Sequence, residues 1–224
     1  MTLSKVAMKK QVLLALAVAC LVPAIPAAAK PERPSRTEAL AALRKSDAAE
    51  RRRGALGLAI VGRMEDAPTL IIALRDTDER VRVVAEQALW AVWSRSGDAR
   101  VDELFARGVA QIGEQRLPEA IATFTRVIEL KPDFAEGWNK RATAYFLAGE
   151  FRRSLKDCGE VVKRNPQHFG VLSGYGQIYL ELDQPAKALE YFRRALEVNP
   201  NLEGVKGLAE RLDSMIVRRR QRSI

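Results

Sequence analysis

The sequence predicts an all-α protein, a right-handed α-solenoid of helical hairpins. Pro132, Pro166 and Pro200 are evenly spaced, and each follows an apolar helical pattern. A second and shorter period lays the segment ALRKSD at 42–47 over ALRDTD at 73–78. After Pro200, apolar residues at spacings of three and four predict one more amphipathic helix, within a capping and basic tail segment at 201–224. The stripe consists of Leu202, Val205, Leu208, Leu212 and Ile216.

Composition limits the possible functions. The 224 residues include 37 Lys or Arg and 28 Asp or Glu, a net charge of +9, and 47% are apolar. This balance excludes a wholly disordered, collagen-like or multi-span membrane chain. One histidine and two cysteines leave little for metal chemistry or for a disulfide framework. The sequence therefore favours binding over catalysis, with no cofactor and no metal.

The N-terminus has the layout of a secretory signal. Three lysines precede an apolar run at 12–22, and small residues end the segment 1–29. The run is about half the length that a membrane anchor needs. We expect cleavage after Ala29, a short leader at 30–36 and a periplasmic location in a Gram-negative type envelope. Lipidation of Cys20 is the alternative, and it would place the chain on a membrane.

Three units of equal length follow, at about 100–133, 134–167 and 168–201. They resemble the tetratricopeptide repeat (TPR) family, whose small residues let the two helices of a hairpin approach and whose aromatic residues fill the space between hairpins. The small residues at positions 8 and 20 are Gly108, Ala142 and Gly176 with Ala120, Ser154 and Ala188, and position 24 carries Phe124, Cys158 and Phe192. In the first repeat Gln111 replaces the usual aromatic residue at position 11.

The segment 37–97 resembles two short HEAT-like repeats of the phycobilisome-lyase type, which does not imply bilin attachment. Asp47 with Glu50, and Asp76 with Glu79, have the spacing of a capping box at the start of each second helix.

The two repeat types are expected to join in one continuous solenoid. The linker 94–100 is short and polar, so it predicts a turn. We expect Trp90 and Trp93 to face the first tetratricopeptide hairpin as packing residues, with a binding role as the alternative.

Candidates for chemistry are few. His168, in NPQHFG, is expected to be a turn histidine bonded to backbone or water rather than a catalytic base. Cys158 occupies a packing position, which favours an inert thiol over a redox sensor. Gly170, Gly174 and Gly176 lack the preceding strand of a phosphate loop, so they are interpreted as helix entry and close packing.

The resemblance implies a concave groove lined by the first helix of each repeat. The carboxylate clamp of the chaperone-binding members is absent, because only Asn139 and Lys140 occupy its zone. Apolar and amide side chains there suit an extended or helical peptide. The expected groove residues are Phe105, Val109, Ile112, Asn139, Thr143, Phe146, Ser173, Gln177 and Leu180.

The stretch from EGWNKRA to the HFG turn is similar to a group of exported bacterial tetratricopeptide proteins. The leading hypothesis is therefore a non-enzymatic interaction module or scaffold that binds a protein segment in the cell envelope. The alternative is an electrostatic adaptor that contacts anionic lipid or polymer, with no nucleic acid partner. Its contact residues would be Arg218, Arg219, Arg220 and Arg222.

Overall fold

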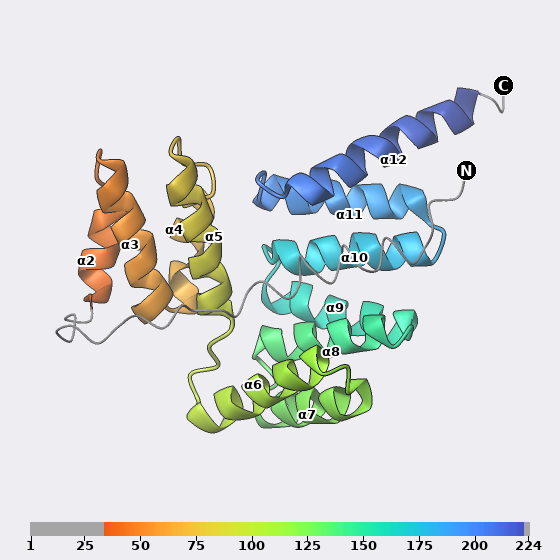
Figure 1. The fold of residues 1–224 in the computed structure, drawn as a ribbon, viewed down its shortest axis with the longest axis horizontal. Coiled ribbons are helices and arrows are strands. Elements are labelled where there is room, and N and C mark those ends of the chain that lie inside the picture. The colour runs from red at the N-terminus through yellow and green to blue at the C-terminus, as the bar shows by residue number, and fades with distance from the viewer. Residues whose placement is uncertain (1–33, 222–224) are drawn as a thin grey trace.

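The computed structural model describes residues 34–221, whose regular elements are all helices (Figure 1). The expected all-α solenoid class is confirmed for this part of the chain, whereas the secretory signal lies outside it. The elements are α2 (Arg36–Ala42), α3 (Ala48–Val61), the short 3-10 helix η2 (Met64–Asp66), α4 (Ala67–Ala73), α5 (Glu79–Trp93), α6 (Ala99–Gly113), α7 (Leu117–Leu130), α8 (Ala135–Leu147), α9 (Phe151–Arg164), α10 (Phe169–Glu181), α11 (Pro185–Val198) and α12 (Glu203–Gln221).

Helices α6 to α11 form three antiparallel hairpins that stack side by side, here called the array (Figure 1). Within two hairpins a glycine of the first helix lies against an aromatic ring of the second. A Cβ added at Gly108 would overlap the ring of Phe124, and one added at Gly176 would overlap Phe192. The prediction that small residues allow the two helices to approach closely is confirmed at both positions.

Helix α12 packs on α11 and then continues beyond the packed surface. Ala209 and Leu212 are buried in one apolar cluster with Phe192. Further along α12, Met215 and Val217 are 45% and 48% exposed. Among the described residues no helix has the length and apolar character required to cross a bilayer.

Helices α2 to α5 form a second group, here called the N-terminal unit (residues 34–93), whose buried core also includes Phe169 of α10. Its resemblance to HEAT-like repeats remains a prediction. Asp47 is the N-cap of α3 as expected, because its side chain accepts the backbone N–H of Glu50 at 2.9 Å. The Glu50 side chain does not complete the expected capping box, since it forms an ion pair with Arg53.

The second expected capping box is wrong. Helix α5 begins at Glu79, so its cap is Asp78, which accepts the backbone N–H groups of Arg80 and Val81. Asp76 lies too early in the chain to reach those groups. Its carboxylate instead accepts two hydrogen bonds from Arg51, at 2.6 and 2.8 Å, and so joins the two hairpins of the N-terminal unit.

The expected joint between the N-terminal unit and the array is also wrong. Trp90 and Trp93 do not face the first hairpin, because their rings contact His168 and Phe169 at the start of α10. The turn between α11 and α12 is bound as well, since Asn199 donates to Glu86 at 2.9 Å. Figure 1 accordingly shows the N-terminal unit beside the ends of α10 to α12 rather than in line with α6.

The linker between the two groups is fixed by the N-terminal unit itself. The guanidinium of Arg95 donates to the carbonyl oxygens of Gly62, at 2.6 Å, and Ala59. Gly97 follows with a φ of +79°, a left-handed conformation that glycine adopts without strain. The chain therefore turns sharply here, as expected. After the turn, the hairpins of the array lie beside the N-terminal unit (Figure 1).

Candidate functional site

The first helices of the three hairpins, α6, α8 and α10, are neighbours and line one face of the array. Phe105 differs from the other expected groove residues, because it is only 7% exposed and its ring packs against Phe124 and Phe134. It supports this face from within the core. The expected groove residues that stay partly exposed are Val109, Ile112, Asn139, Thr143, Phe146, Ser173, Gln177 and Leu180.

Most polar side chains of this face are already engaged. The Asn139 amide donates to both carboxylate oxygens of Glu136, at 3.1 and 3.0 Å. The hydroxyls of Thr143 and Ser173 donate to backbone carbonyls of their own helices, at 3.0 and 2.9 Å. No hydrogen bond among the described residues uses the Gln177 side chain, so its amide is the group best able to bind a ligand.

A fully buried pair, Glu136 and His168, lies where the array meets the N-terminal unit. No local motif in the sequence marks this pairing, because the two residues belong to different repeats. The Nδ1 atom of His168 accepts the backbone N–H of Val171 at 3.1 Å and thereby caps α10. Its Nε2 atom therefore carries the proton and donates it to a carboxylate oxygen of Glu136. The expected backbone bond of His168 is confirmed.

The carboxyl group of Glu136 is ionised at neutral pH. Burial is the strongest single influence and acts to raise its pKa, while the contact with His168 acts to lower it. Lys140, whose Nζ lies 4.0 Å away, and Asn139 act in the same direction, so that the pKa is about 2. This carboxylate is held by these three polar partners and serves as an anchor between α8 and α10.

Cys158 is buried, and burial raises the pKa of its thiol to about 12. The thiolate, which is the nucleophilic form, is therefore scarce at neutral pH. This agrees with the expectation of an inert packing thiol. Within residues 34–221 no three His, Cys, Asp or Glu side chains are grouped to hold a metal ion.

The two tryptophans of α5 cover the buried pair. The Trp93 ring stacks on His168, with 4.4 Å between centroids and 24° between planes, and Trp90 meets the same ring edge-on at 5.4 Å. A Cβ at Gly170 would overlap Trp90, so the close packing expected of Gly170 is confirmed, whereas that expected of Gly174 is wrong because a Cβ there would meet no atom within 4 Å. Lys140 lies on α8 and Gly170 on α10, two of the helices that line this face. The N-terminal unit therefore reaches the edge of that face.

The basic segments differ in their surroundings. Arg51 is bound to Asp76, and Arg153 pairs with Glu150 at 2.6 Å. Arg218 is exposed near the end of α12. Arg219 and Arg220 belong to the last turn of that helix, and Arg222 lies outside the described residues.

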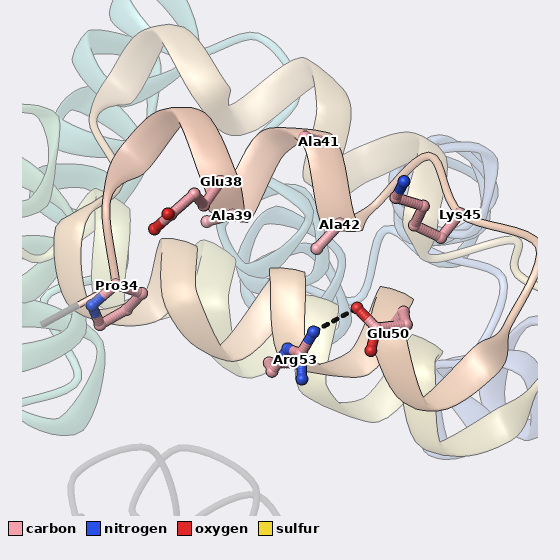
Figure 2. Close-up of a pocket in the computed structure, with 8 residues that line it drawn as sticks. All are labelled: Pro34, Glu38, Ala39, Ala41, Ala42, Lys45, Glu50 and Arg53. Atoms are coloured by element: carbon pink, nitrogen blue, oxygen red, sulfur yellow. Dashed lines mark hydrogen bonds and ion pairs between the residues drawn. The ribbon is translucent and has the colours of Figure 1, made fainter. Parts of the chain in front are cut away.

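A cleft of about 450 Å³ lies between α2 and α3 (Figure 2). Figure 2 shows the alanines and Glu38 of α2 opposite Glu50 and Arg53 of α3, which form an ion pair. Helices α2 and α3 lie on the side of the N-terminal unit away from the array (Figure 1). The lining of the cleft consists of Pro34, Glu38, Ala39, Ala41, Ala42, Lys45, Glu50 and Arg53.

Known proteins resemble the array in sequence. Two family models of the tetratricopeptide repeat match residues 105–157 and 176–202. A TPR repeat-containing protein of Rhizobium etli is 36% identical over 142 residues, which cover 62% of this chain and 69% of the relative. Hsp70-Hsp90 organizing protein 1 of Glycine max is 27% identical over 116 residues, but these make up only 20% of its length and 50% of this chain.

Solved structures show the same fold for about half of the chain. The first TPR domain of Spaghetti (RPAP3), bound to the HSP90 peptide SRMEEVD, has a TM-score of 0.51 at 22% identity and covers 54% of this chain and 96% of that domain. The Sgt2 TPR domain of Aspergillus fumigatus has a TM-score of 0.52 at 19% identity, with 55% and 83% covered. With the match to the Rhizobium protein, these findings identify the chain as a member of the tetratricopeptide repeat family.

Proposed function

We propose that this protein is a non-enzymatic interaction module of the cell envelope that binds a peptide segment of a partner on the concave face of its array. One observation carries the proposal: the first helices present a row of partly exposed apolar side chains beside the unengaged amide of Gln177. Apolar side chains can take up those of a peptide, and an amide can pair with its backbone. The peptide bound by the RPAP3 domain supports this class of ligand.

The anchor of the groove is expected to be Phe146. It comes from the central helix α8, is partly exposed and is tilted against Phe151 at 5.7 Å. Aromatic residues near the centre of an interface contribute most of the binding energy. Val109 and Leu180 lie on the neighbouring helices, α6 and α10.

The test is capture of partners from envelope extracts on the mature chain, residues 30–224. The partner found is then titrated against Phe146→Ala, Gln177→Ala and the matched control Ile72→Ala, which alters a 74% exposed apolar residue of α4. We expect Phe146→Ala to weaken binding by about 2 kcal/mol, or roughly thirtyfold, and the control to have no effect. Equal affinity of all variants would refute the groove as the site.

Export is part of the proposal, and the lysine-rich, apolar and small-residue pattern of residues 1–29 supports it. The measurement is the N-terminal sequence of protein from fractionated cells. A mature chain that starts at Lys30 supports cleavage of a secretory signal. A blocked chain that starts at Cys20 would instead indicate a lipoprotein, and an intact Met1 in the cytoplasm would contradict export.

A second candidate function is an electrostatic adaptor on anionic lipid, favoured by the end of α12. There Met215 and Val217 are exposed beside Arg218, a combination of apolar and basic side chains that suits a membrane surface. We would expect binding to anionic vesicles that weakens with added salt, because exposed charges are screened over about 10 Å at 0.1 M. Unchanged binding after Arg218, Arg219, Arg220 and Arg222 are replaced by Gln would contradict this function.

A further inference from the structure

The geometry points to Trp90 as an additional wall of the groove, so that the binding site is composite and its partner is an internal, uncharged segment with apolar side chains. This inference rests on the proposed function and specifies its partner. It assigns a role in binding to a residue of the N-terminal unit, which lies outside the repeats matched by the family models.

The position of Trp90 follows from its contacts with the groove face. Its ring occupies the space that a side chain at Gly170 would need, and the Nζ atom of Lys140 lies 5.8 Å from the ring centroid. One turn further along α10, a Cβ at Gly174 would meet no atom within 4 Å. Trp90 therefore covers the first turn of α10, and the space next to it, at Gly174, is open.

The chemistry of Trp90 differs from that of its neighbour. Trp93 is 3% exposed and belongs to the buried core of the joint. Trp90 is partly exposed, and no hydrogen bond among the described residues uses its Nε1. An indole with a free N–H donor and an apolar ring suits a peptide, because the N–H can donate to a backbone carbonyl while the ring covers a side chain.

The charges at this end of the groove do not favour binding of a peptide's C-terminal carboxylate. Lys140 is the basic side chain of the groove face here, and it lies against the Glu136 carboxylate and the Trp90 ring. Asn139 donates to the same carboxylate. The Lys140 ammonium is therefore already paired with the ionised and fully buried Glu136 carboxylate, so this pair offers a terminal carboxylate little net positive charge. An internal segment needs no such charge.

The experiment selects peptides on the full mature chain from a hexapeptide library displayed with its C-termini fused to the phage coat protein, so that no terminal carboxylate is present. An enriched peptide is then made in acetylated form, both as the amide and as the free acid, and titrated by calorimetry. We expect the two forms to bind within about twofold of each other.

Two variants test the indole. Trp90→Phe keeps a ring at the joint but removes the N–H, so we expect about fivefold weaker binding, the usual cost of one lost hydrogen bond. Trp90→Ala should weaken binding further. Trp138→Phe is the matched control, since the Trp138 indole already donates to the carbonyl of Pro132 at 3.0 Å, and it should bind as the native chain does. Near-UV circular dichroism reports whether each variant keeps its packing.

The outcomes separate this inference from the proposed function. If Phe146→Ala abolishes binding while both Trp90 variants bind normally, the groove stands and the composite site is refuted. Tighter binding by Trp90→Ala would also refute it, because Trp90 would then compete with the partner. Much tighter binding of the free acid would refute the uncharged segment. Failure to enrich any peptide would contradict the proposed function itself.

Discussion

Aromatic rings pack in two different ways in this protein. Inside the array, Phe124 and Phe192 each lie over a glycine of their own hairpin, and the contact of the first repeat recurs in the third. At the joint, Trp90 lies over Gly170, which is distant in sequence and belongs to a hairpin of another kind. The first contact follows from a local rule that the repeat restates. The second occurs once, and it depends on residues that do not belong to the repeat pattern.

The largest effect is expected when the N-terminal unit and the array are expressed as separate fragments. Residues 37–97 expressed alone should not give a cooperative thermal transition, because the buried cluster of the N-terminal unit includes Phe169 from the array. Residues 100–224 hold three hairpins and α12, so we expect them to melt cooperatively by circular dichroism. A cooperative melt of the 37–97 fragment would show that the N-terminal unit is an independent domain.

The same contrast explains what the sequence could predict. The hairpins, the close approach at Gly108 and Gly176 and the inert Cys158 follow from periodic positions, which encode contacts between residues near in sequence. The joint could not be predicted in this way, because no periodic position in the sequence encodes the contact of Trp93 with His168. The expected role of Asp76 is wrong because an aspartate suits a capping box and an ion pair between hairpins equally well, and the sequence alone does not distinguish them.

The candidate site was predictable to a similar extent. The repeat register placed Phe146 and Gln177 on the concave face, where the structure leaves them partly exposed. It gave no indication that Phe105 would be buried or that Glu136 would engage Asn139. Both depend on neighbours brought in by other helices.

Within the array, the largest single-residue effect should come from Phe192, which is completely buried. Phe192→Ala is expected to lower the free energy of unfolding by about 4 kcal/mol, the typical cost of removing a buried phenylalanine ring. Urea unfolding of the 100–224 fragment measures this, with exposed Val217→Ala as the control. A loss under about 1 kcal/mol would mean that the hairpin closes over the cavity.

At the joint, Glu136 predicts a pH dependence. Its pKa is lowered from an ordinary 4.5 to about 2 in the folded protein. The ionised carboxylate therefore contributes stability that is present above pH 4.5 and is lost as the pH falls toward 2. The shift corresponds to a contribution on the order of 3 kcal/mol.

The measurement is urea unfolding of the full mature chain across this pH range. Native protein should lose more stability on acidification than Glu136→Gln, in which the ionisation is absent. The other carboxyl groups with lowered pKa values are common to both chains and cancel in the difference; they are Glu38, Asp66, Asp76 and Glu160. Glu129→Gln, at an exposed ion pair with Arg126, should follow the native curve. Parallel curves for native protein and Glu136→Gln would contradict the role of the buried pair.

The smallest effect tests the joint with two glycines of one helix. Gly174→Ala should raise the stability of the full chain by about 0.5 to 1 kcal/mol, because alanine favours a helix and open space receives the methyl group. Gly170→Ala gains the same propensity but places its methyl group against Trp90, so a net loss of about 1 kcal/mol is expected. In the Trp90→Ala background the ring is absent and the Cε1 atom of His168, 3.2 Å from the added Cβ, remains close, so Gly170→Ala should lose most of its penalty. This double-mutant cycle isolates the contact between the two residues. If Gly170→Ala has the same effect with and without Trp90, the ring does not occupy that position in solution. The contacts of Phe124 and Phe192 with their glycines would then have no counterpart at the joint.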